Sequence, residues 1–215
     1  ISWTSDNELT AGGSMNLSAS GTFSWSEDTS LPIENPFDTP AGPYACGWPQ
    51  NNPKNLQADY SLSNGSVFPN ARLRDQCGDE EDTWDLYGRY LVFDNTQPDC
   101  PPCRLMAETA EAFTTSMKDS GIDVMMVSLM GNGLSSVLEE PSPETVDSWV
   151  SAYNLTGPVL ADRGFGYAVM PSYYERNYGY PAWIVVGPDM KVIGGGIGFG
   201  DWDDIQEIIV NDAGQ

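Results

Sequence analysis

The feature that most constrains this chain is the tetrapeptide Cys100-Pro101-Pro102-Cys103, which stands between a buried strand pattern and a helical pattern. Two cysteines separated by two residues can close a small disulfide ring and open it again at little geometric cost. At the start of a helix, the free backbone N–H groups and the helix dipole stabilise a thiolate on the first sulfur. The spacing and its context therefore predict a redox centre.

A structural zinc half-site is the alternative interpretation of the same pair. Such a site needs two further ligands, and the chain offers only Cys46 and Cys77, with no histidine. The lack of histidine also excludes Ser-His-Asp and Cys-His hydrolases and a histidine-containing copper site. The acidic runs 78–82 and 201–204 lack the ligand spacing of an EF-hand loop, so we expect a solvated acidic face. We expect no bound metal and no other cofactor.

The charge of the chain limits its partners. Its 215 residues include 31 acidic and 9 basic side chains, for a formal net charge of -22. This balance argues against nucleic acid and anionic membranes as partners. No apolar run approaches the length of a membrane span. Four cysteines, many small polar residues and few lysines predict an extracytoplasmic protein, whether periplasmic, cell-surface or secreted.

The chain is predicted to have two parts. Residues 1–65 form an extension rich in Ser, Thr, Gly and Pro, β-rich or irregular, and residues 66–215 form a regular domain. In the domain, strand patterns alternate with helical patterns before a closing hairpin and helix, which indicates an α/β sandwich with a mixed sheet. The expected strands and helices lie at 90–94, 103–121, 122–129, 142–153, 158–161, 182–186, 191–197 and 201–210.

Several motifs of this domain occur in the order of a known family. They are Val67-Phe68-Pro69-Asn70 with its continuation to Gly78, the segment 84–93, the Cys-Pro-Pro-Cys motif, Tyr180-Pro181 before the strand 182–186, and the Gly187-Pro188-Asp189 turn. Together they cover about two-thirds of the chain, and they resemble the thioredoxin superfamily in its exported TlpA/ResA and redoxin-like branch. The resemblance implies a thioredoxin-like fold, with a mixed central sheet flanked by helices.

The resemblance also implies roles for individual residues. Cys100 corresponds to the nucleophile that attacks a substrate disulfide, and Cys103 to the thiol that resolves the mixed disulfide. Pro181 corresponds to the family's cis-proline, whose preceding residue, Tyr180, offers its backbone to an incoming chain. Asp94 corresponds to a buried carboxylate that accepts a proton from the resolving cysteine. An ordinary residue at the end of a strand is the alternative interpretation of Asp94.

Two departures from the family leave the redox direction open. Asp99 replaces the usual aromatic residue before the first cysteine, and its carboxylate opposes thiolate formation, while Arg104 offsets part of this effect. The Pro-Pro dipeptide replaces the more common Gly-Pro and removes two N–H donors. A peroxidatic cysteine would follow a threonine by three residues, whereas Thr96 precedes Cys100 by four, so we do not expect peroxidase activity.

Cys46 and Cys77 lie outside the redox motif in turn-like surroundings. We expect a structural disulfide between them that staples the extension to the domain. Closing a loop of this length contributes roughly 3–4 kcal/mol in the chain-entropy model. A second redox pair that relays electrons to Cys100 and Cys103 is the alternative, and no motif supports it.

These observations predict an exported thiol–disulfide oxidoreductase that acts on protein thiols and disulfides through Cys100 and Cys103. The alternative is an extracellular or cell-surface binding module, with the same fold and a non-catalytic disulfide, whose N-terminal arm serves attachment or assembly.

Overall fold

The computed structural model describes residues 13–17, 23–27, 42–133, 136, 139–166, 169 and 179–214. By their contacts the residues divide into two units, Ile1–Pro40 and Ala41–Gln215. In the first unit, β1 (Gly13–Leu17) and β2 (Phe23–Glu27) pair as an antiparallel hairpin. The other residues before 42 lie outside the described residues, and so does the hypothesis that the N-terminal arm serves assembly.

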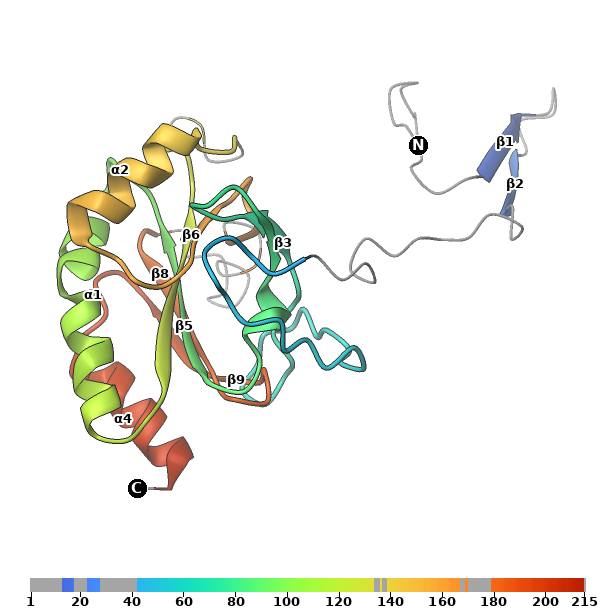
Figure 1. The fold of residues 1–215 in the computed structure, drawn as a ribbon. Coiled ribbons are helices and arrows are strands. Elements are labelled where there is room, and N and C mark those ends of the chain that lie inside the picture. Colours follow the sequence, from blue (N-terminus) through green and yellow to red (C-terminus); the bar gives the residue numbers. More distant parts are fainter. Residues whose placement is uncertain are drawn as a thin grey trace. The chain divides into compact units, whose positions relative to one another are not determined.

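The second unit is built on a mixed sheet in which β5 is an interior strand, parallel to β6 and antiparallel to β8 (Figure 1). The seven strands follow the order β4 (Glu80–Asp82), β3 (Arg72–Arg74), β7 (Val159–Ala161), β6 (Val124–Met130), β5 (Tyr90–Thr96), β8 (Ala182–Val186) and β9 (Val192–Ile197). The helical elements described are η1 (Thr83–Leu86), α1 (Pro101–Asp119), α2 (Pro143–Tyr153) and α4 (Trp202–Ala213). This arrangement confirms the predicted α/β architecture with a mixed sheet.

The interior strand β5 is buried along its whole length, as expected for a strand covered on both faces. Its side chains alternate between two hydrophobic clusters: Leu91 and Phe93 join one, and Val92 joins the other. The strand therefore carries its last residues, which lead to the cysteine pair, into the interior of the unit.

Helix α1 packs on the β5 face that carries Val92. Its buried residues recur at helical spacing, and the cluster also takes in Ile205 and Ile209 of α4. In Figure 1, α1, α2 and α4 lie on the same side of the sheet. Helix α1 ends before Gly121, which has a φ of 83°. Among the described helices, none combines the length and the apolar character that a membrane span requires.

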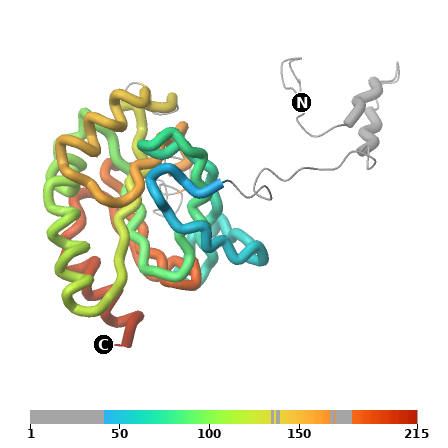
Figure 2. Tube along the Cα trace, viewed as in Figure 1, coloured from blue at the N-terminus to red at the C-terminus, as the bar shows by residue number. Residues whose placement is uncertain are grey.

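Residues 42–65, which the sequence analysis assigned to the extension, belong to the second unit. Figure 2 shows their blue-to-cyan trace beside the strands that follow. Leu62 is fully buried in the cluster of Leu91 and Phe93, and the Gly65 N–H donates to the Val192 carbonyl over 2.8 Å. The next segment closes the same face, because Phe68 stacks on Phe93 with ring centroids 4.3 Å apart. Burial of these apolar side chains attaches the segment to the sheet.

Candidate redox site

The end of β5 delivers the chain directly into the Cys-Pro-Pro-Cys motif. After Thr96 a turn follows, in which the Cys100 N–H donates to the Gln97 carbonyl over 3.3 Å. Cys100 is the N-cap of α1, and the two prolines occupy the first helical positions. Proline is favourable there because the first N–H groups of a helix have no partner within the helix. The motif therefore begins a regular helix without a backbone penalty.

Cys100 and Cys103 are joined by a disulfide, with their Cα atoms 5.3 Å apart. The Cys103 N–H donates to Sγ of Cys100 over 3.2 Å. When the bond opens, this N–H and the helix dipole face the first sulfur and favour its thiolate form. Cys100 is 4% exposed and Cys103 is fully buried, so only Cys100 of the two reaches the surface.

The structure brings Tyr180 to the same place. The Tyr180–Pro181 peptide bond is cis. Since Asn95 pairs with Ala182, Pro181 lies next to the end of β5, where the chain turns towards Cys100. Tyr180 is partly buried against the cluster that contains both cysteines. The predicted substrate-binding residues and the predicted redox pair therefore form one site.

Asp94 lies in β5, between Ser128 of β6 and Trp183 of β8. Its side chain is 2% exposed, and its Oδ1 has no hydrogen-bond partner among the described residues. Burial raises the pKa of Asp94 to about 7. Within the described residues no hydrogen bond joins Asp94 to either cysteine in this disulfide form. The carboxyl group can exchange a proton near neutral pH.

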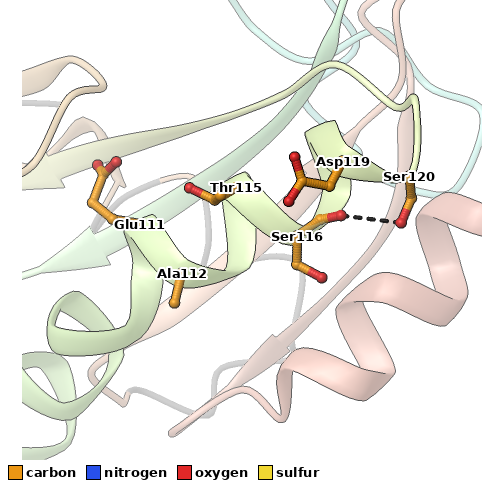
Figure 3. Close-up of a pocket in the computed structure, with 6 residues that line it drawn as sticks. All are labelled: Glu111, Ala112, Thr115, Ser116, Asp119 and Ser120. Atoms are coloured by element: carbon orange, nitrogen blue, oxygen red, sulfur yellow. Dashed lines mark hydrogen bonds between the residues drawn. The ribbon is translucent and has the colours of Figure 1, made fainter.

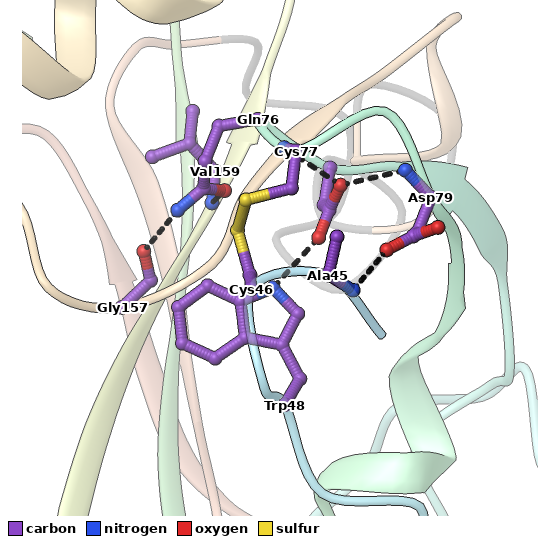
Figure 4. Close-up of a disulfide and its surroundings, with 9 residues drawn as sticks. Ala45, Cys46, Trp48, Gln76, Cys77, Asp79, Gly157 and Val159 are labelled. Atoms are coloured by element: carbon purple, nitrogen blue, oxygen red, sulfur yellow. Dashed lines mark hydrogen bonds between the residues drawn. A yellow bond between two sulfur atoms is a disulfide. The ribbon is translucent and has the colours of Figure 1, made fainter. Parts of the chain in front are cut away.

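The second disulfide joins Cys46 to Cys77, with their Cα atoms 5.7 Å apart (Figure 4). Asp75 organises the surrounding loops. Its carboxylate accepts hydrogen bonds from the backbone N–H groups of Cys77 and Asp79 and from the indole N–H of Trp48. A sulfur or carboxylate oxygen of each of Cys46, Cys77 and Asp75 lies within 4.8 Å of the others, but the two sulfurs are bonded to each other. The disulfide thus fixes residues 42–50 to the turn after β3.

Glu81 is a buried carboxyl group that no pattern in the sequence indicated. Residues 78–82 were expected to form a solvated acidic face, and this is wrong for Glu81 and Asp82, which are 0% and 2% exposed. Glu81 pairs with Leu73 across β3 and β4, which turns its side chain towards the apolar side. Burial, together with the nearby charges of Asp75 and Asp85, raises the pKa of Glu81 to about 9. The acidic sequence of residues 78–82 gives no indication that Glu81 is buried.

A polar run at the end of β5 was also missed. Asn95, Thr96 and Gln97 are buried, and side-chain atoms of all three have no hydrogen-bond partner among the described residues. Their position just before the cysteine pair was visible in the sequence, but their burial follows from the interior place of β5 in the sheet.

A surface depression on α1 lies apart from the redox site (Figure 3). It is lined by small and polar side chains of the last half of the helix, namely Glu111, Ala112, Thr115, Ser116, Asp119 and Ser120. The cysteines lie at the opposite end of the same helix. We assign the depression no part in the redox chemistry.

Comparison with known proteins gives a family and a fold. The model of the AhpC/TSA family matches residues 65–194. No curated protein matches the chain in sequence.

Three solved structures illustrate the fold. The thioredoxin domain of a thiol-disulfide oxidoreductase from Bacteroides vulgatus has 19% identity and a TM-score of 0.53, covering 68% of this chain and 98% of the other. A protein described as thiol:disulfide interchange protein DsbE from Chlorobium tepidum has 18% identity and a TM-score of 0.56, covering 70% and 97%. A secreted thiol-disulfide isomerase from Corynebacterium glutamicum has 12% identity and a TM-score of 0.55, covering 70% and 86%. These similarities confirm the predicted thioredoxin-like fold.

Proposed function

The chain belongs to the AhpC/TSA family, and from this premise we propose that it is a thiol–disulfide oxidoreductase that acts on protein substrates through Cys100 and Cys103. One observation carries the proposal: a disulfide stands at the N-terminus of α1, with the Cys103 N–H directed at Sγ of Cys100. This arrangement favours the first sulfur as nucleophile and leaving group. The spacing of Thr96, four residues before Cys100 where a peroxidatic cysteine has a threonine three residues before it, favours disulfide exchange over peroxide reduction.

In the reducing direction, the Cys100 thiolate attacks one sulfur of the substrate disulfide and the other sulfur leaves as a thiolate. The Cys103 thiolate then attacks Sγ of Cys100 and releases the second substrate thiolate. Two electrons pass to the substrate, and the Cys100–Cys103 disulfide remains. The oxidising direction is the reverse of these two steps.

Asp94 is proposed as the proton acceptor for Cys103. A carboxyl group whose pKa is about 7 accepts a proton near neutral pH and gives it up again at little cost. Tyr180 and Pro181 are proposed to hold the substrate chain beside the pair, since Tyr180 packs against the cysteine cluster.

Cys46 and Cys77 are proposed as a structural staple without a redox role. Their disulfide links two loops that also share the hydrogen bonds of Asp75. A stable staple of this kind requires an oxidising compartment. We therefore propose an extracytoplasmic location.

The alternative is a binding module with an inert Cys100–Cys103 disulfide, and insulin reduction by dithiothreitol separates the two. We expect the protein to accelerate insulin precipitation and Cys100→Ser to abolish the acceleration. The double variant Cys46→Ser/Cys77→Ser is the matched control, since it removes the other disulfide and should keep the activity. Equal rates with wild-type protein and Cys100→Ser would favour the inert module.

A further inference from the structure

Two exposed apolar side chains lie on segments that adjoin the cysteine pair and Pro181. Among the described residues, three large hydrophobic side chains are exposed: Tyr60 at 66%, Leu105 at 54% and Phe199 at 50%. Leu105 lies on α1, two residues after Cys103. Phe199 follows Gly198, whose N–H donates to the Pro181 carbonyl over 2.7 Å. Two of the three therefore border the redox site.

Contacts between α4 and α1 join the segment after Phe199 to the face of α1 that carries Leu105. The Trp202 ring stacks on Phe113 with centroids 4.5 Å apart, and its indole N–H donates to the Thr109 hydroxyl over 2.7 Å. Thr109 lies one turn after Leu105, on the same face of α1. The segment that carries Phe199 is thus tied to Pro181 at one end and to α1 at the other.

The backbone next to Phe199 approaches buried side chains closely. A Cβ atom on Gly200 would lie 2.8 Å from the indole nitrogen of Trp183 and 3.1 Å from Cδ1 of Ile205. The loop therefore rests directly on buried side chains. The side chain of Phe199 itself is half exposed and lies outside the hydrophobic core.

The surroundings of the two apolar side chains are acidic. Residues 99–108 and 199–204 contain one basic side chain, Arg104, and five exposed acidic ones, Asp99, Glu108, Asp201, Asp203 and Asp204. Arg104 donates to the Pro98 carbonyl over 2.8 Å. The whole chain carries a net charge of -22, which attracts cationic partners and repels anionic ones.

We propose that Leu105 and Phe199 form a docking surface for a cationic, apolar segment of the substrate protein. The occupant is an extended segment with a large apolar side chain and Lys or Arg residues next to its reacting cysteine. The inference rests on the proposed function, because the segment is presented to Cys100 for the exchange described above. The apolar side chain covers Leu105 and Phe199, and the basic residues meet the acidic rim.

The test uses the reduced protein and three peptide dimers, each held together by a disulfide between two identical peptides. The peptides differ only in the two residues beside the cysteine, which are Leu and Lys, Leu and Glu, or Ser and Lys, and the dimers are named after these residues. The small uncharged 2-hydroxyethyl disulfide is the reference, because it reacts at Cys100 without covering the surface. Second-order rate constants are measured for wild-type protein, Leu105→Gln and Phe199→Gln. Tyr60→Gln is the matched control, since it removes the third exposed apolar side chain.

The Leu-Lys dimer should react at least about tenfold faster than the Leu-Glu dimer at low salt, and the ratio should shrink in 0.5 M salt. Leu105→Gln and Phe199→Gln should slow the Leu-Lys dimer several-fold and leave the 2-hydroxyethyl disulfide and the Ser-Lys dimer unchanged. Equal rate constants for all three dimers would overturn the inference, and so would a fall in the Leu-Lys rate constant in Tyr60→Gln as large as in Leu105→Gln and Phe199→Gln. In either case, reaction with the reference disulfide would still support the proposed function. No reaction with the reference disulfide would overturn the proposed function, and the inference with it.

Discussion

Asp94 is the residue whose proposed role depends most on its surroundings. A carboxyl group in water ionises near pH 4, but in β5 burial raises the pKa of Asp94 to about 7. The same side chain at the end of an exposed strand could not take and return a proton at neutral pH. Its proposed chemistry comes from the interior position of β5.

The variant Asp94→Asn keeps the shape of the side chain and removes the base. We expect the release of substrate by Cys103 to slow by on the order of 10². In wild-type protein this rate should rise with pH and bend near 7, where Asp94 becomes a carboxylate, whereas in the variant it should keep rising above 7 as the Cys103 thiol itself ionises. Stopped-flow decay of a mixed disulfide on Cys100, followed from pH 5.5 to 8.5, measures both effects. An unchanged rate and profile would remove Asp94 from the mechanism.

Glu81 predicts a pH dependence of stability. Burial raises its pKa from 4.5 to about 9, so between these values the folded chain holds a proton that the unfolded chain releases. The contribution of Glu81 to the free energy of unfolding is greatest below about pH 4.5. It is lost as the pH rises towards 9, by up to about 1.4 kcal/mol per pH unit. Glu81→Gln should therefore gain stability relative to wild type as pH rises.

Urea unfolding of both proteins at pH 5, 7 and 9 measures this difference. Glu80→Gln is the matched control, because Glu80 lies next to Glu81 in β4 and is exposed. A constant difference between wild type and Glu81→Gln across this range would show that Glu81 ionises normally in the folded chain.

The helices and strands that the sequence predicted are those with regularly spaced apolar residues or a clear boundary residue. Helix α1 has apolar residues at helical spacing between a capping cysteine and Gly121, β5 begins with the apolar run Tyr90 to Phe93, and β6 is apolar except for Ser128. The short strands β3 and β4 were not predicted as separate elements. Three residues are too few to show a strand's alternation of apolar and polar side chains, and β4 is entirely acidic. Their pairing depends on contacts distant in sequence.

The loop held by Cys46 and Cys77 gives a prediction at the same scale. The two cysteines are 31 residues apart, and the double variant Cys46→Ser/Cys77→Ser should lose about 3–4 kcal/mol of unfolding free energy. The disulfide exchange of Cys100 and Cys103 should remain within a factor of two of wild type in conditions where the variant is folded. Chemical denaturation and the insulin assay measure the two quantities. A loss of exchange in the folded variant would favour the electron relay over the staple.

For the whole molecule, the order of motifs predicted the fold but not the extent of the folded unit. Residues 42–65 contain Gly and Pro and few apolar side chains, so their pattern indicated a connector. In the structure Leu62 is fully buried and Tyr44 donates to the Asp85 carboxylate over 2.6 Å, and both contacts lie inside the second unit. Single buried anchors of this kind have no periodic signature. The cysteine pair and Pro181, in contrast, belong to short motifs that the sequence shows directly.

The most direct test of the central claim is a redox titration of the Cys100–Cys103 disulfide in folded Cys46→Ser/Cys77→Ser protein, where it is the only disulfide. The account predicts one two-electron transition at a potential between about −270 and −120 mV, the range of thiol–disulfide oxidoreductases. A disulfide that stays closed in the folded protein down to about −300 mV would behave as a structural bond and contradict the account.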